Sequence, residues 1–190
     1  MGKKLSEMAL EELWMLFPIQ LTEHNDGWEK QYREMAEDLE KKLSSRKVIR
    51  ISHIGSTAIK GIWAKPIVDI LVEISLDEDI QAAARQIEKC GFLRMSEEKG
   101  RISFNKGYTE NGFAEKVYHL HLRYEGDNDE LYFRDYLIDH PGIAKEYERL
   151  KLSLWRQYEH NRDAYTEAKT NFVKKHTAGA RSQYGNRYLK

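Results

Sequence analysis

The chain has 190 residues, of which 41% are hydrophobic and 33% are charged, and its formal net charge is zero. This composition predicts a soluble globular protein with one domain, or one domain and a helical appendage. No half of the chain is strongly basic, which argues against broad DNA or RNA binding, although two or three basic residues could still hold a small anion. A single cysteine, Cys90, excludes an internal disulfide and a cysteine-based zinc site.

Residues 1–18 form an N-terminal amphipathic segment. Apolar residues at near-helical spacing predict a helix over residues 6–17 that ends at Pro18. We expect this helix to pack on the domain or to mediate association with a partner, so an oligomer formed through it stays open. Three glutamates interrupt the segment, and no run reaches the roughly 18 apolar residues of a membrane span, so we expect a cytoplasmic protein that does not contact membranes.

Residues 19–180 are predicted to form one α+β domain. Strands are expected at 48–54, 66–74, 92–96, 101–108 and 116–124. Helices are expected at 27–43, 75–91, 131–140, 141–158 and 161–176. The strands occupy a sheet part at about 45–125, and a helical part follows at about 129–180. Because no flexible linker divides the two parts, we expect them to pack as one unit.

An aspartate interrupts the apolar strand PIVDILVEI. Side chains alternate along a strand, so Val68 and Ile70 share one face while Asp69 and Leu71 share the other. An ionised carboxylate on a buried strand costs several kcal/mol unless it has a partner. A metal, a cationic ligand or a neighbouring base would supply that partner to Asp69.

A Gly-Ser turn closes the preceding strand at Gly55 and Ser56, and Thr57 follows. Such a turn offers unobstructed backbone N–H groups and hydroxyls, which suit a phosphate or another anion. Most Gly-Ser turns are only turns, so the assignment depends on what lies nearby.

The combined pattern resembles a known superfamily. A strand, a Gly-Ser turn and, about a dozen residues on, a strand with an aspartate resemble the nucleotidyltransferases. Together with YHLHL, FRDYLIDHPGIAKEYERLKLSL and NRDAYTEAKTNF in this order, the stretch HIGSTAIKGIWAKPIVDILVEI is similar to the GrpB family, a bacterial group with that fold, over roughly residues 19–180. The resemblance implies a nucleotidyltransferase-like mixed β-sheet flanked by helices, with the Gly-Ser turn holding the phosphates of a nucleotide.

The resemblance also implies two metal-binding aspartates at alternate positions of one strand. The first position matches Asp69, but the second is Leu71. Glu73 does not replace it, because four residues of strand span about 13 Å and two metals of a shared site lie about 3.5–4 Å apart. The sequence therefore departs from the two-metal transfer pattern.

The strand KVYHLHLRY places His119, His121 and Arg123 on one face. If this strand lies near that of Asp69, two imidazoles and a carboxylate make a set for one divalent metal such as Mg, Mn or Zn. The histidines could instead hydrogen-bond Asp69 and contact a phosphate directly, or simply face water.

Basic residues that could meet a phosphate are Lys65, Lys169 and Arg123. Lys65 precedes Pro66 at the mouth of the aspartate strand, and Lys169 lies on the last long helix; either could also be merely solvent-exposed. Arg134 is expected to tie the helical part to the sheet. We therefore expect a protein that binds a nucleotide or another phosphorylated small molecule. It would be a metal-dependent transferase with Asp69 as the catalytic residue, or a non-catalytic binding or interaction module.

Overall fold

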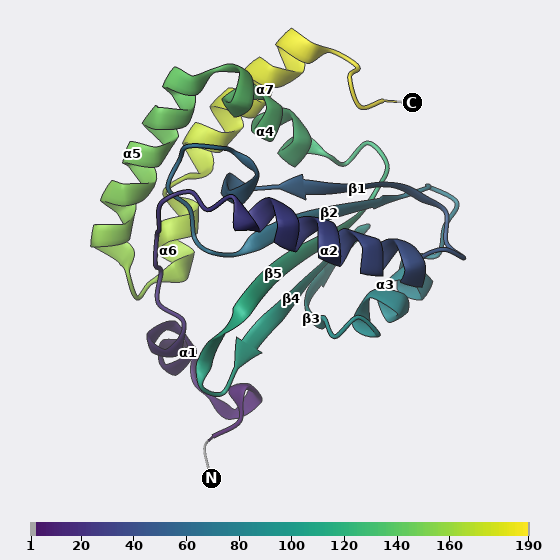
Figure 1. The fold of residues 1–190 in the computed structure, drawn as a ribbon, viewed down its shortest axis with the longest axis horizontal. Coiled ribbons are helices and arrows are strands. Elements are labelled where there is room, and N and C mark those ends of the chain that lie inside the picture. The colour runs from purple at the N-terminus through teal and green to yellow at the C-terminus, as the bar shows by residue number, and fades with distance from the viewer. Residues whose placement is uncertain (1–2, 190) are drawn as a thin grey trace.

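The computed structural model describes residues 3–189, which fold around a five-stranded sheet in the order β1-β2-β5-β4-β3 (Figure 1). The strands are β1 (Val48–Ile54), β2 (Val68–Ile74), β3 (Leu93–Glu98), β4 (Arg101–Thr109) and β5 (Gly112–Tyr124). β2 and β5 run parallel, and the other neighbouring pairs are antiparallel. The predicted α+β class, with a mixed sheet flanked by helices, is confirmed.

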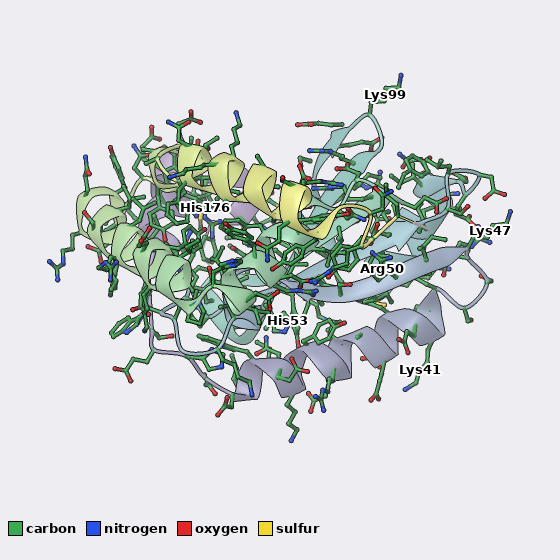
Figure 2. All side chains as sticks on the ribbon, turned by 90° about the horizontal axis from the view of Figure 1, so that it is seen from above. Lys41, Lys47, Arg50, His53, Lys99 and His176 are labelled. Carbon is green, nitrogen blue, oxygen red and sulfur yellow. The ribbon has the colours of Figure 1, made fainter. Side chains whose placement is uncertain are left out.

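Helices cover both faces of this sheet. They are α1 (Leu10–Leu16), α2 (Gly27–Lys42), α3 (Ile80–Glu88), α4 (Asp129–Asp139), α5 (Pro141–Tyr158), α6 (Arg162–Glu167) and α7 (Thr170–Tyr184), with 3-10 turns η1 (Leu5–Glu7) and η2 (Ser56–Ala58). Figure 2 shows α2 on one side of the sheet and α7 on the other. Within residues 3–189, no helix is both long enough and apolar enough to cross a membrane.

The face of the sheet toward α2 and α3 holds the main core. Val68, Ile70 and Val72 of β2 are fully buried there beside Leu120 and Leu122 of β5. Apolar residues of α2 and α3 complete this cluster. Burial of this kind stabilises the fold by roughly 25 cal/mol per Å² of apolar surface removed from water.

The opposite face is covered in part by the C-terminal helices. Leu71 is buried in a small cluster with Ile54 and Leu131, against which Tyr188 packs. As expected, Arg134 of α4 joins the two parts, because its Nη1 donates to the backbone carbonyl of His53, 2.8 Å away. The rest of this face is polar and lies at the site described below.

Two predicted helices differ from the observed ones. The helix expected over residues 6–17 is a 3-10 turn and a shorter α1, separated at an extended Met8, because Glu12 accepts from the backbone N–H of Ala9 and starts a new helix there. The helix expected over residues 161–176 is two helices, with Lys169 at their junction. Lys169 thus occupies the N-cap position of α7 and does not lie within one long helix.

Candidate functional site

The site begins where β1 ends beside β2. In their antiparallel register Ile54 lies opposite Asp69, so the Gly-Ser turn starts next to the carboxylate. Gly55 has a φ of 70°, in the region that favours glycine, and a Cβ built on it would overlap Oδ2 of Asp69. Gly55 is therefore required both by the turn and by the position of Asp69.

Two histidines face Asp69 from the neighbouring strand. The parallel register pairs Asp69 with His119, whose Nδ1 lies 3.2 Å from Oδ1, and Nε2 of His121 lies 3.9 Å from the same oxygen. Burial alone would raise the pKa of Asp69, but hydrogen bonding and charge interactions with the two histidines outweigh burial and lower it below its usual value. Asp69 is therefore an ionised carboxylate whose side chain is 26% exposed.

A chain of hydrogen bonds leads from His119 to the C-terminal helices. Nε2 of His119 lies 2.8 Å from the hydroxyl of Tyr108, which in turn accepts from Nη2 of Arg162 at 2.7 Å. Tyr108 reaches this face because the β4–β5 register shifts between Lys106 and Tyr108, at Gly107. The bulge moves Tyr108 onto the same face as His119.

A cavity of about 670 Å³, here called the basic cavity, opens beside Asp69. It is lined by four basic side chains, Lys65, Lys151, Arg162 and Lys169, and by two acidic ones, Asp69 and Asp163. Gly55, Ser56 and Thr57 of the turn also line it, as does His119. Excess positive charge in a concave site attracts anions.

Three lysines of the basic cavity are buried or half-buried. The ammonium groups of Lys65 and Lys169 lie 4.5 and 4.3 Å from the ring centroid of buried Tyr165. Lys151 is 2% exposed, and its ammonium donates to the carbonyl of Trp63. In the part of the chain that the structure describes, no carboxylate lies within 4.0 Å of these ammonium groups.

Burial and mutual repulsion make these lysines easier to deprotonate. Burial first, and then the charge of Lys169, lower the pKa of Lys65 and of Lys151 to about 7. Burial likewise lowers the pKa of Lys169 to about 8 against the opposing pull of Asp69. A bound anion would supply the negative charge that these ammonium groups lack as a close partner.

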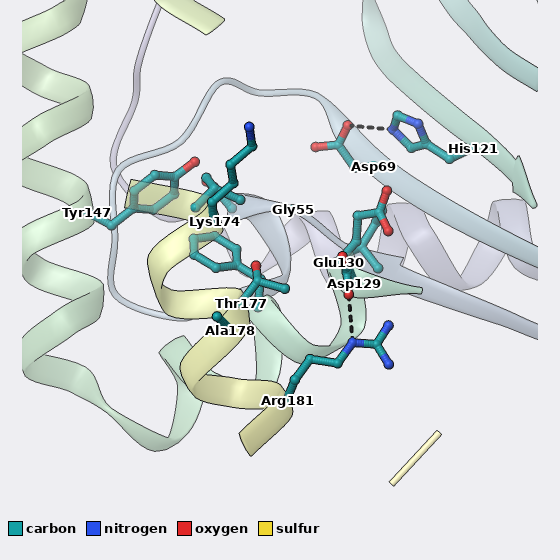
Figure 3. A pocket seen from close by; sticks show the side chains of 14 residues that line it. Gly55, Asp69, His121, Asp129, Glu130, Tyr147, Lys174, Thr177, Ala178 and Arg181 are labelled. Atoms are coloured by element: carbon teal, nitrogen blue, oxygen red, sulfur yellow. Dashed lines mark hydrogen bonds and ion pairs between the residues drawn. The ribbon is translucent and has the colours of Figure 1, made fainter. Parts of the chain in front are cut away.

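A second cavity of about 590 Å³, here called the mixed cavity, is also lined by Asp69 (Figure 3). Gly55, Ser56, Asp69 and Tyr147 line both cavities, so the two spaces meet at these residues. The apolar wall of the mixed cavity comes from α4, α5 and α7 and consists of Phe133, Tyr147, Val173 and Ala178. The charged groups around it are Asp129, Glu130, Lys174 and Arg181. Asp129 and Arg181 form an ion pair of 2.7 Å.

The structure brings most of the predicted site residues together. Gly55, Ser56, Thr57, Lys65, His119 and Lys169 line the basic cavity with Asp69, and His121 lines the mixed cavity. Arg123 lies behind them: it is 6% exposed, and its Nη2 lies 3.3 Å from Nδ1 of His121. Arg123 thus contacts a site histidine and donates to the carbonyls of Ile102 and Leu122. It does not line the basic cavity or the mixed cavity.

Several residues of the site were not predicted from the sequence, among them Lys151, Tyr108, Arg162 and Tyr147. Lys151 could have been found from the sequence, because it lies at helical spacing between Tyr147 and Leu154 on the apolar face of α5, where a lysine is unusual. Tyr108 was signalled by Gly107, since a glycine within a strand pattern indicates a bulge. No local sequence pattern marked Arg162 or Tyr147 as a site residue, because only the packing of the helices places them against the sheet.

Comparison with known proteins agrees with this architecture. The family model described as GrpB protein matches residues 18–178. This chain belongs to the GrpB family. A crystal structure titled conserved protein GrpB from Enterococcus faecalis is 29% identical, has a TM-score of 0.74, and covers 87% of this chain and 99% of that one.

Curated GrpB relatives are bacterial. The glutamate-rich protein GrpB of Alkalihalophilus pseudofirmus is 35% identical over 159 residues, which cover 80% of this chain and 90% of the relative. The UPF0157 protein YqkA of Bacillus subtilis is 32% identical over 179 residues, which cover 90% of this chain. This GrpB chain spans only half the length of YqkA.

Proposed function

We propose that this GrpB protein binds a nucleotide or another phosphorylated small molecule, with the phosphates in the basic cavity. The observation that carries the proposal is the set of three desolvated lysines without carboxylate partners, beside a Gly-Ser turn. Partly desolvated charges without a counter-charge destabilise a fold, so three such lysines around one cavity support a ligand that neutralises them.

The turn adds directional donors to this charge. Ser56 and Thr57 begin the short turn η2, and Thr57 is fixed by a hydrogen bond of 3.0 Å between its hydroxyl and Nε2 of buried His53. Arg162 supplies a planar donor group, which suits the paired oxygens of a phosphate. Charge and directional donors therefore converge on the same volume.

The mixed cavity would hold the uncharged part of the same ligand. Its aromatic wall is rigid, because the rings of Phe133 and Tyr147 meet edge to face at 5.3 Å and Phe172 stacks behind Tyr147 at 5.2 Å. Glu130 at the rim could accept from a hydroxyl or an amino group. A ligand with a phosphate end and an organic body would therefore span Asp69.

Binding should be measured first by isothermal titration calorimetry with pyrophosphate and tripolyphosphate. We expect the double variant Lys65→Met/Lys169→Met to lose at least about tenfold in affinity, because two of the four cations are gone. Lys41→Met is the matched control, since Lys41 is an exposed lysine on α2, across the sheet (Figure 2). Equal affinity of the wild type and the double variant, or no binding by either, would refute the proposal.

Nucleotidyl or phosphoryl transfer would be an additional property of the same cavity. Asp69→Asn separates the two roles: a transferase loses turnover of a nucleoside triphosphate, whereas a binding module has no turnover to lose. Leu71 favours the binding module, because it is buried in an apolar cluster where the superfamily has a second metal-binding aspartate.

A further inference from the structure

The hydrogen bonds around His119 determine where its imidazole proton lies. Tyr108 accepts from Arg162, which can only donate, so the single phenolic proton is free to be given to Nε2 of His119. An accepting ring nitrogen carries no proton, so the proton of a neutral imidazole is on Nδ1, facing Asp69. The other tautomer would set a lone pair against the carboxylate.

The second histidine is oriented in the same sense. The guanidinium of Arg123 can only donate, so Nδ1 of His121 accepts from it at 3.3 Å. The proton of His121 is then on Nε2, which is the nitrogen facing Asp69. Both histidines therefore present N–H groups to the carboxylate, through two independent supports.

This arrangement does not fit a metal centre. A metal held by Asp69, His119 and His121 needs the lone pairs of the nitrogens that face the carboxylate, and those nitrogens carry protons here. To free such a lone pair, the proton must move to the other ring nitrogen, which breaks the hydrogen bond from Tyr108 to His119 or from Arg123 to His121. The charge that a metal would bring is already present, because four basic side chains line the basic cavity.

We infer that Asp69 contacts the ligand directly, by accepting a hydrogen bond from a hydroxyl or amino group close to the phosphate, and that no divalent metal bridges them. The histidines approach Oδ1, whereas Oδ2 lies against Gly55, where the two cavities meet. The inference rests on phosphate binding as proposed above, and it makes Tyr108 and Arg162 positioning residues.

Metal dependence is the first test. The full chain, stripped with EDTA, is titrated with MnCl2, with ZnCl2 and with pyrophosphate. We expect wild type and Asp69→Asn to take up either metal equally, and pyrophosphate to bind within about twofold with or without EDTA. One metal ion per chain that is lost in Asp69→Asn, or pyrophosphate binding that requires a metal, overturns the inference. Absence of pyrophosphate binding under every condition instead refutes the proposed function.

The tautomers are the second test. Long-range 15N–1H spectra of the imidazoles should show the proton of His119 on Nδ1 and that of His121 on Nε2. Tyr108→Phe removes the donor to His119, so we expect a mixed tautomer and at least a tenfold gain in Zn²⁺ affinity. Tyr124→Phe is the control and should behave as wild type. It also deletes a hydroxyl, one that donates to the backbone carbonyl of Glu78. An unchanged His119 tautomer in Tyr108→Phe would contradict the hydrogen-bond chain.

Direct contact is the third test. Ethyl phosphate and 2-aminoethyl phosphate differ only by an amine, and wild type should prefer the amine by about fivefold or more. Asp69→Asn should reduce that preference. Equal affinity of the wild type for the two phosphates would overturn a direct hydrogen bond to Asp69.

Discussion

The two faces of the central sheet use the same strands for different purposes. On the face toward α2 and α3, inward residues of β2 and β5 such as Ile70 and Leu122 are apolar and fully buried. On the opposite face the same strands present Asp69, His119 and His121, which remain a quarter exposed beside two cavities. The strand alternation thus separates stabilising residues from ligand-facing ones within a single element.

The second face is itself divided along its length. Leu71 follows Asp69 by one step on this face, yet it is 0% exposed and packs with Ile54 and Leu131. The polar site therefore ends between Asp69 and Leu71, where α4 covers the sheet. This boundary explains why a second carboxylate has no place here.

The largest expected effect is at that boundary. Leu71→Asp should destabilise the protein by about 4 kcal/mol or more, because an ionised carboxylate would be buried without a partner. Leu71→Met is the matched control and should cost below about 1.5 kcal/mol. Urea denaturation followed by circular dichroism measures both, and a stable Leu71→Asp would show that this part of the face is open.

On the core face, Leu122→Ala should lower the free energy of unfolding by about 2–5 kcal/mol, since it leaves a cavity in the main cluster. Ser103→Ala removes a small polar group from the other face, at the basic cavity, and should change stability by no more than about 0.5 kcal/mol. Comparable losses for the two variants would contradict the division between the faces.

At the turn, Gly55→Ala should cost about 1–3 kcal/mol and weaken pyrophosphate binding, because the methyl group both strains the backbone and displaces Asp69. Gly61→Ala is a precise control. Gly61 has a φ of 77°, but a Cβ there would have no neighbour within 4 Å. The difference between the two variants in denaturation and calorimetry isolates the contact with Asp69, and equal behaviour would argue against it.

The last expected effect is the pH dependence of stability that the lysines cause. Their folded-state pKa values of about 7 to about 8 lie below the unfolded value of 10.5, so the unfolded chain binds more protons across this window. Stability should therefore rise as the pH rises from 7 toward 10.5.

Anion binding should show the opposite trend, since it needs the protonated lysines. Pyrophosphate affinity measured by calorimetry should fall over the same interval from pH 7 to 9. In the variant Lys65→Met/Lys169→Met, both the free energy of unfolding and the pyrophosphate affinity should depend less on pH. A stability that falls with pH, and that the double variant leaves unchanged, would argue against desolvated lysines.

Several features followed from the sequence by local physics. Periodicity located the strands at 48–54 and around Asp69, and alternation predicted which side chains share a face. The sequence could state only as a condition that the histidine strand lies near the aspartate strand, and the pairing of Asp69 with His119 meets that condition. For this cluster the sequence left open metal binding, direct hydrogen bonding to Asp69 and exposure of the histidines to water.

The rest was decided by tertiary packing. The bulge at Gly107 turns Tyr108 to the site. The junction between α6 and α7 brings Lys169 to the basic cavity, and the buried face of α5 brings Lys151 there. Helix α6 supplies Arg162. Arg162 and Tyr108 are 54 positions apart, and Lys151 and Trp63 are 88 positions apart. The distances between them depend on how the helices sit on the sheet. Sequence patterns report on neighbours within a few residues along the chain, so they specified the strands and their faces, whereas the protonated nitrogens around Asp69 could be assigned only once the packed donors were in place.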